Sequence, residues 1–302
     1  MTENLSTSPG GPAVFFTDFD GTIKPEGDAR ISPDDLRALS DMKAAGWTRA
    51  VATGRSLFGF AKAWQPGLEL DWLIFSSGAG LCAWSPMGPG PMLSGRLFSP
   101  AEAEAAVKAA LALGYGFFAY AAPPDNHHFH YHMPQGPPAG FLKRLDIFQA
   151  QSRLWPTDGL ERLQGGETSL AGGQMLIMTP EAEADRAEAE FRRLAPGLSV
   201  VRASSPFGDG CLWLEIFPPQ VSKGRAAADL ARRLGLDPAL CAAAGNDYND
   251  RDLLDWAGRP FITADAPAEL RGPADRPRYG IIPPAGNGGL AEAWRQINGS
   301  RK

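Results

Sequence analysis

Short runs of apolar, β-prone residues alternate with amphipathic stretches over the first third of the chain. Residues 14–17, 47–53 and 72–75 are such runs, and each is typical of a buried strand. Between the first two runs, Ser32 is the expected N-cap of a helix, with a proline next and Asp35 as the acid of a capping box. Strands that alternate with helices predict a parallel α/β sheet.

A different pattern begins near Ser99, the expected N-cap of a helix that ends at about Leu113. Another helix is expected to begin at Thr179. Strand-like runs dominate the rest of this region, at residues 115–121, 129–133, 174–178, 198–203 and 211–217. The βα pattern then returns, with a helix over 223–234, a strand over 240–244, a loop over 245–250 and a helix towards Ala257. This order predicts an α+β unit inserted into the parallel α/β unit.

We therefore expect two domains of ordinary size. Residues 1–83 and 216–302 form a doubly wound, Rossmann-like parallel sheet, and residues 84–215 form the inserted α+β domain. Residues 72–95 carry a long uncharged stretch, but its prolines and glycines would break a membrane-spanning helix. We expect a buried strand followed by a loop there.

The charge balance argues against a polyanionic partner. The chain has 29 lysines and arginines against 34 aspartates and glutamates, a formal net charge of −5, and no basic block. Neither nucleic acid nor an anionic membrane surface is favoured, and a small molecule is the expected partner. The three cysteines, Cys82, Cys211 and Cys241, are scattered and odd in number. We expect reduced thiols, no disulfide and no zinc.

The first residues have no basic segment followed by an apolar core. This predicts a short disordered leader rather than a signal peptide, and a cytoplasmic protein. The sequence leaves the oligomeric state open.

Asp18 and Asp20 lie two residues apart, directly after the first predicted strand. Two carboxylates so close repel each other, and a hard cation relieves that repulsion. Oxygen ligands with room for a substrate phosphate suit Mg²⁺, so the sequence predicts a magnesium site. Further candidate ligands lie in a second loop after a predicted strand, where ligands gather in open α/β sheets: Asn246, Asp247, Asn249 and Asp250.

Four segments, in order, resemble the motifs of the haloacid dehalogenase superfamily. They are Asp18-Phe19-Asp20-Gly21-Thr22, Thr53-Gly54-Arg55, Ser222-Lys223-Gly224 and Gly245-Asn246-Asp247-Tyr248-Asn249-Asp250. The chain is similar in particular to the Cof-type and sucrose-phosphatase-like phosphohydrolases. Their α/β cap domain lies between the second and third motifs, where this chain has its insert. The resemblance covers the core, while the cap is matched in position and class only.

The resemblance implies a Mg²⁺-dependent phosphatase that acts through an aspartyl-phosphate on a small phosphorylated metabolite, with a sugar phosphate as the expected substrate. Asp18 would be the nucleophile, and Asp20 would protonate the leaving alcohol and later activate water. Thr53 and Lys223 would bind the phosphate and complete the catalytic set.

The same resemblance implies the binding residues. Asp18, the backbone carbonyl of Asp20 and Asn246 would hold the cation. Asp250 would orient Lys223 or a cation-bound water, and Asp247 would lie beside the ligands. Gly54, Arg55 and Asn249 would contact the substrate, although Arg55 could instead cap the sheet edge. The fourth motif usually begins Gly-Asp, so Asn246 removes one formal charge and implies weaker metal affinity or a larger role for Asp247.

Other interpretations stay open. A phosphomutase with the same core and cap would return the phosphoryl group to a second hydroxyl, and a non-catalytic module would bind a phosphorylated ligand without turnover. All four histidines lie in residues 127–132, where alternation places His128, His130 and His132 on one strand face. That face could bind a transition metal, contact the leaving group of the substrate, or be an exposed polar face of the cap.

Overall fold

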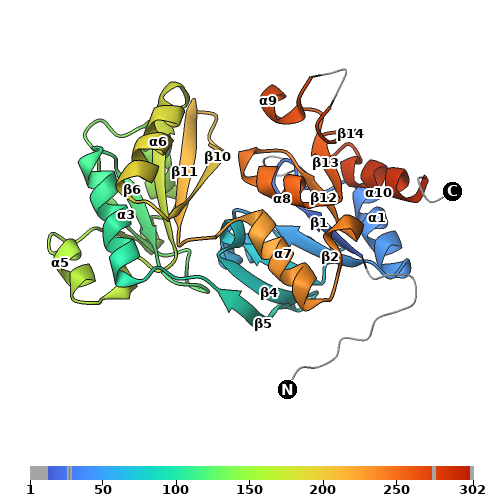
Figure 1. Ribbon diagram of the computed structural model, residues 1–302, viewed down its shortest axis with the longest axis horizontal. Coiled ribbons are helices and arrows are strands. Elements are labelled where there is room, and N and C mark those ends of the chain that lie inside the picture. The colour runs from blue at the N-terminus through green and yellow to red at the C-terminus, as the bar shows by residue number, and fades with distance from the viewer. Residues whose placement is uncertain (1–12, 26, 28, 274–276, 300–302) are drawn as a thin grey trace. The chain divides into compact units, whose positions relative to one another are not determined.

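The computed structural model describes residues 13–25, 27, 29–273 and 277–299, and the expected N-terminal leader lies outside them. The chain divides into two compact units (Figure 1). Unit 1 is Met1–Gly54, Ala61–Ser94 and Ser222–Lys302, and unit 2 is Arg55–Phe60 and Gly95–Val221. A parallel-rich sheet flanked by helices in unit 1 and a mixed unit 2 confirm the expected α/β class with an inserted α+β unit.

Unit 1 is built on an eight-stranded sheet in the order β14-β13-β12-β1-β2-β3-β4-β5. The neighbours from β14 to β3 are parallel, and β4 runs antiparallel to β3. The strands are β1 (Val14–Thr17), β2 (Thr48–Ala52), β3 (Trp72–Phe75), β4 (Gly80–Ser85), β5 (Gly88–Gly95), β12 (Ala242–Gly245), β13 (Arg259–Thr263) and β14 (Gly280–Ile282). The helices are α1 (Pro33–Ala44), α7 (Lys223–Arg233), α8 (Arg251–Trp256), α9 (Ala268–Arg271) and α10 (Gly289–Gly299), and α2 (Leu57–Ala63) spans a boundary between the two units.

Helices cover both faces of this sheet. Val14 and Phe16 of β1 share a hydrophobic core with Leu230 of α7 and Leu253 of α8. On the opposite face, α1 and α10 lie side by side (Figure 1). Every residue of β1 is buried, as expected for a strand covered on both sides. In a sheet of this kind the carboxyl ends of the parallel neighbours β12, β1 and β2 meet at one edge, where ligands bind.

The expected loop after residue 75 is wrong, because two further strands follow β3. β4 and β5 are joined by two residues and extend the unit 1 sheet. Pro89 and Pro91 suggested a loop, but β5 lies at the edge of the sheet, where a missing N–H breaks no ladder. Residues 84–94 therefore belong with unit 1 rather than with the insert.

The second expected boundary, before residue 216, also moves. β11 (Cys211–Phe217) continues through Phe217, which pairs with Ser199 of β10 (Ser199–Ser204). Residues 216–221 therefore belong with unit 2.

Unit 2 contains a six-stranded sheet in the order β10-β11-β9-β6-β7-β8, antiparallel except between β7 and β8. Its other strands are β6 (Phe117–Tyr120), β7 (Phe129–His132), β8 (Ser152–Leu154) and β9 (Gln174–Pro180), and its helices are α3 (Pro100–Ala112), α4 (Ala139–Ile147), α5 (Gly159–Gln164) and α6 (Ala184–Leu194). Alternating residues of β6 divide between two cores, with Phe117 in one and Phe118 in the other. The capping box at Ser99 is present as predicted. The helix expected from Thr179 is wrong at its start, because β9 runs on to Pro180.

The side chain of Asp35, in the first turn of α1, caps the start of α10 instead of completing a capping box in α1. Ser32 caps α1 as predicted, but the fully buried Asp35 side chain accepts a hydrogen bond from the backbone N–H of Ala291, 3.0 Å away, at the start of α10. Asp35 Oδ2 has no hydrogen-bond partner. Burial raises the pKa of Asp35, although the backbone N–H groups of Ala291 and Leu290 oppose the shift.

A pair of substitutions separates the two roles of Asp35. The folded-state pKa of Asp35 is raised, so ionisation of this side chain lowers the free energy of unfolding of the protein as the pH rises above the unfolded-state pKa of about 3.9. Asp35→Asn removes the charge and keeps an acceptor for Ala291, so its free energy of unfolding at pH 7 should equal or exceed that of the native protein. Asp35→Ala loses the cap, at a cost of about 1–2 kcal/mol. Urea unfolding measures both, and an Asn variant as unstable as the Ala variant would contradict this account.

Candidate active site

The ends of three neighbouring strands carry the first residues of the site. Asp18 follows β1, its backbone N–H donates to the carbonyl of Ala244 at 2.8 Å, and it is almost fully buried. Thr53 follows β2, and its N–H donates to the carbonyl of Ile74 at 2.9 Å. The loop after β12 ends in a short 3₁₀ turn, Tyr248–Asp250. Sequence segments far apart thus meet at one sheet edge.

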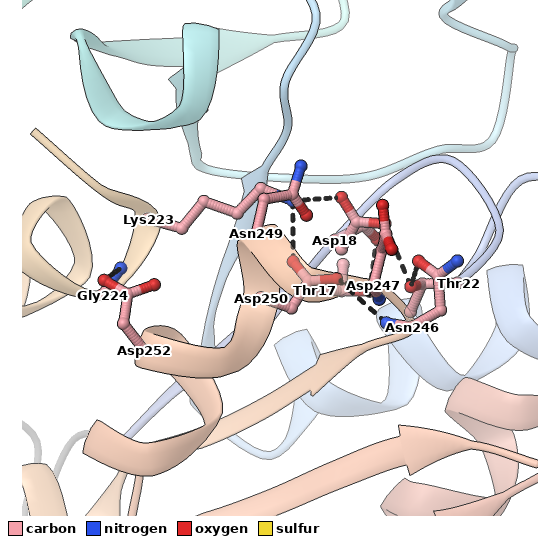
Figure 2. A network of polar contacts seen from close by, with 10 residues as sticks. All are labelled: Thr17, Asp18, Thr22, Lys223, Gly224, Asn246, Asp247, Asn249, Asp250 and Asp252. Atoms are coloured by element: carbon pink, nitrogen blue, oxygen red, sulfur yellow. Dashed lines mark hydrogen bonds and ion pairs between the residues drawn. The ribbon is translucent and has the colours of Figure 1, made fainter. Parts of the chain in front are cut away.

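Lys223 joins two of these segments. It is the first residue of α7, and its fully buried side chain extends from the helix start. The Nζ atom lies 2.6 Å from Oδ1 of Asp18, 2.7 Å from Oδ1 of Asp250 and 3.1 Å from Oδ1 of Asn249 (Figure 2). The three acceptors leave the ammonium with a full set of partners. One buried cation therefore holds two carboxylates at the centre of the site.

The pKa values of Asp18 and Lys223 reflect two buried carboxylates that share one ammonium. Burial first, and the charge of Asp250 second, raise the pKa of Asp18 to about 7 against the opposing effect of Lys223. Burial alone would lower the pKa of Lys223, but the charges of Asp18 and Asp250 raise it above its ordinary value. Lys223 is therefore charged at neutral pH, and a further cation near Asp18 would favour the ionised carboxylate.

Oxygen atoms gather beside the second oxygen of Asp18. One terminal atom of the Asn246 amide lies 3.1 Å from Asp18 Oδ2 and 3.0 Å from the backbone carbonyl of Asp20. With nitrogen at that position the amide donates to both oxygens. With oxygen there, its distances of 3.1 and 3.0 Å to these two oxygens match the spacing expected between neighbouring oxygen ligands of Mg²⁺, about 3.0 Å for metal–oxygen bonds of about 2.1 Å. The residues present therefore fit a small hard cation.

Gly21 allows this approach. Its φ is +78°, a left-handed conformation, and a Cβ built on it would lie 2.3 Å from the Asn246 amide nitrogen. A side chain at this position would displace Asn246 from Asp18 and Asp20.

Sequence reasoning gave no role to two residues that support the site. Thr22 Oγ1 lies 3.0 Å from Asp18 Oδ2 and 2.9 Å from Asn246 Oδ1, so its hydroxyl donates within the oxygen group. Asp252 Oδ2 accepts from the backbone N–H of Gly224 at 3.0 Å and so anchors the first turn of α7 behind Lys223 (Figure 2). Thr22 stands inside a quoted motif, whereas no local pattern links Asp252 to a residue 28 positions away.

Asp250 has a second function beside its ion pair. Its Oδ2 accepts from the backbone N–H groups of Asn246 and Asp247, at 2.9 and 3.1 Å. It therefore fixes the loop that presents Asn246 as well as the ammonium of Lys223. Asp247 begins the turn, and its carbonyl accepts from the N–H of Asp250 at 3.0 Å.

Gly54 and Arg55 lie at a boundary between the two units. Gly54 lies in unit 1 beside Asn249, whereas Arg55 is grouped with unit 2, where its Nη1 donates to the carbonyl of Gly59 at 3.5 Å. The side chain of Asp20 is exposed beside the buried Asp18, so solvent reaches it. The backbone carbonyl of Asp20 lies 3.0 Å from a terminal atom of the Asn246 amide.

The histidine-rich strand is packed by aromatic rings. His132 stacks on Phe117, with ring centroids 5.5 Å apart, and His130 meets the edge of Trp155 at 6.4 Å. His127 stacks on Phe58 at 4.1 Å. Within the described part of the chain, no three His, Cys, Asp or Glu side chains are grouped so that they could hold a metal ion.

The haloacid dehalogenase-like hydrolase family matches residues 15–293, and the chain therefore belongs to this family. Solved structures share its fold along nearly the whole length. The phosphatase BT1666 from Bacteroides thetaiotaomicron superimposes with a TM-score of 0.74 at 17% identity, covering 98% of this chain and 99% of that one. The sugar phosphatase BT4131, of subclass IIB, has a TM-score of 0.70 at 17% identity, covering 94% of this chain and 98% of that one.

Two curated relatives are HMP-PP phosphatases. That of Cronobacter sakazakii is 40% identical over 69 residues, and that of Klebsiella pneumoniae is 38% identical over 69 residues. Each match covers 23% of this chain and 25% of the relative, so the chain spans about a quarter of these proteins. Across the described ranges, no helix has the length and apolarity needed to cross a bilayer.

Proposed function

We propose that the protein is a cytoplasmic, Mg²⁺-dependent phosphomonoesterase that acts through an aspartyl-phosphate on Asp18. One observation carries the proposal: the two oxygens of Asp18 have different partners. Oδ1 accepts from the buried ammonium of Lys223 at 2.6 Å, and Oδ2 faces the oxygen group of Asp20 and Asn246. Lys223 holds Oδ1 in place, and a cation bound beside Oδ2 would supply a second positive charge, so both would neutralise the charge of a phosphoryl group that Asp18 attacks.

The chemical steps follow from the positions of the carboxylates. An oxygen of Asp18 forms a bond to phosphorus while the bond from phosphorus to the leaving alcohol breaks, and Asp20 gives that alcohol its proton. Asp20 then takes a proton from water, whose oxygen attacks phosphorus. The bond to Asp18 breaks, and inorganic phosphate leaves. The exposed Asp20 side chain can exchange this proton with both the substrate and water.

The remaining residues bind charge. Asp18, the Asp20 carbonyl and Asn246 would hold Mg²⁺, which supplies charge neutralisation for the transferred phosphoryl group when it is bound. Lys223 meets the phosphate oxygens from the other side, and Thr53 with the backbone at Gly54 completes the cradle. Each unit charge at about 4 Å contributes roughly 4 kcal/mol at an effective dielectric constant of about 20.

We propose a small phosphorylated metabolite, with sugar phosphates first, as the substrate. The names of the similar proteins, a sugar phosphatase and HMP-PP phosphatases, support this class. The inserted unit 2 would serve as the cap that selects the group attached to the phosphate. Arg55 of unit 2 would contact that group, and Asn249 of unit 1 the phosphate.

Release of inorganic phosphate from a panel of sugar phosphates, other phosphomonoesters and p-nitrophenyl phosphate tests the proposal. We expect release with Mg²⁺ and none with EDTA. Formation of an isomeric phosphate ester without phosphate release would identify a phosphomutase. Binding of phosphate esters with no turnover in either condition would identify a non-catalytic module, and both outcomes would overturn the proposal.

Asn246→Asp is expected to strengthen metal binding. The substitution adds one carboxylate to the oxygen group of Asp18 and Asp20, and metal affinity rises with the charge of the ligands. The Mg²⁺ concentration for half-maximal activity should fall about tenfold, which corresponds to roughly 1.4 kcal/mol. Titration of activity with Mg²⁺ measures it, with Asn298→Asp at an exposed asparagine of α10 as the matched control. An unchanged midpoint would remove Asn246 from the ligand set.

A further inference from the structure

The turn that follows β3 is strained and buried. Ser76 and Ser77, in the turn Ser76–Gly78, have φ values of +48° and +51°, in the left-handed region. Both serines are fully buried. A non-glycine residue in this conformation costs energy that glycine would avoid, and such strain persists where the surrounding structure fixes it, often at functional sites. The turn therefore calls for a reason beyond chain reversal.

The backbone of this turn contacts both phosphate-binding segments. The N–H of Ser77 donates to the carbonyl of Thr53 at 2.9 Å, which fixes the peptide that leads to Gly54. On its other side, Gly78 packs on the start of α7: a Cβ built on it would lie 2.3 Å from the carbonyl oxygen of Ser222, the residue before Lys223. The turn thus contacts both the segment of Thr53 and the start of the helix that carries Lys223.

The hydroxyl of Ser77 also lies near Gly54. A Cβ built on Gly54 would lie 3.6 Å from Ser77 Oγ and 3.7 Å from Asn249 Nδ2. The other end of the Asn249 amide, Oδ1, accepts from Lys223 Nζ at 3.1 Å. Ser77 Oγ and the Asn249 amide nitrogen therefore both lie on the side of Gly54 where a side chain would begin, next to the Thr53 carbonyl that accepts from Ser77 N–H.

We propose that Ser77 is a further positioning residue of the phosphate site. Its N–H and hydroxyl together set the Thr53–Gly54 peptide against Asn249 and Lys223, and the left-handed backbone is the conformation that brings both groups to this peptide. This inference rests on the proposed phosphatase function. If the turn only reversed the chain, glycine at position 77 would serve it better, because glycine carries no strain there.

Three variants test the side chain separately from the backbone. Ser77→Ala removes the hydroxyl and keeps the strain, and Ser77→Gly removes both. Ser77→Asn restores a polar side chain that tolerates the left-handed region. Ser76→Gly is the matched control, because it relieves the same strain at the adjacent residue. Each is assayed with p-nitrophenyl phosphate and Mg²⁺, for inhibition by inorganic phosphate, and for its Tm with and without phosphate and Mg²⁺.

We expect Ser77→Ala and Ser77→Gly to lower kcat/KM about tenfold and to weaken inhibition by phosphate by a similar factor. The Tm of Ser77→Gly without phosphate should equal or exceed that of the native protein, Ser77→Asn should recover part of the activity, and Ser76→Gly should stay within about threefold. A Ser77→Gly variant with native kinetics and phosphate inhibition would overturn the inference. A native protein that neither hydrolyses the ester nor gains Tm with phosphate would instead overturn the proposed function.

Discussion

Asp18→Asn is expected to abolish phosphate release while the fold is retained. Removal of a nucleophile that acts with its partners as a unit costs about four to six orders of magnitude in kcat. The amide has the shape of the carboxylate and can still accept from Lys223, so the network around it should persist. The rate of phosphate release from p-nitrophenyl phosphate, with Mg²⁺ present, measures the loss.

The same substitution should leave the protein as stable as before. The pKa of Asp18 is raised to about 7, chiefly by burial, so the ionised carboxylate is less favoured in the folded chain than in the unfolded one. Neutral asparagine avoids that cost and leaves Lys223 with Asp250. Asp41→Asn, at an exposed aspartate of α1, is the control. An active Asp18→Asn variant, or one that loses activity because it unfolds, would contradict this assignment.

Lys223→Met is expected to impair both catalysis and stability. It leaves Asp18 and Asp250 buried side by side without the ammonium that lies 2.6 and 2.7 Å from them. Breaking a buried pair by removing one partner typically costs about 3–5 kcal/mol, and the lost charge on the phosphoryl group should lower kcat/KM by roughly three orders of magnitude. Urea unfolding without Mg²⁺ and steady-state rates measure the two effects.

Two companion variants make this result specific. Adding Asp250→Asn to Lys223→Met removes one of the two stranded charges, so it should recover stability but not activity. Lys223→Arg keeps the charge, but a planar guanidinium does not fit a fully buried space that holds a compact ammonium. We expect it to remain nearly inactive. A stable, active Lys223→Met variant would show that the ammonium is dispensable.

The sequence predicted the parts of the site that follow directly from strand ends. Asp18 and Asn246 each come after a short apolar run, and parallel strands bring such positions to one edge. The contact from Lys223 to Asp18 spans 205 residues, and no periodicity within either segment encodes it. The role of Lys223 was predicted from its place in the series of motifs, not from the pattern of the residues around it.

The failures of prediction share a cause. Asp35 matches a capping box in sequence, yet tertiary packing gives its carboxylate to α10. Pro89 and Pro91 indicate a loop until β5 is known to lie at the edge of a sheet. Ser77 shows no local sign of its left-handed backbone, because serine rarely adopts it. In each case the deciding contact lies outside the window that a local pattern covers.

The direct test of the central claim is the covalent intermediate. The protein is mixed with p-nitrophenyl phosphate and Mg²⁺, quenched in acid within the first turnovers, digested and analysed by mass spectrometry, in native form and as Asp20→Asn, which should slow hydrolysis of the intermediate. The account predicts one added phosphoryl group on the peptide that contains Asp18, more abundant in Asp20→Asn and absent in Asp18→Asn. Phosphate release with no phosphoryl group on that peptide in either protein would contradict it.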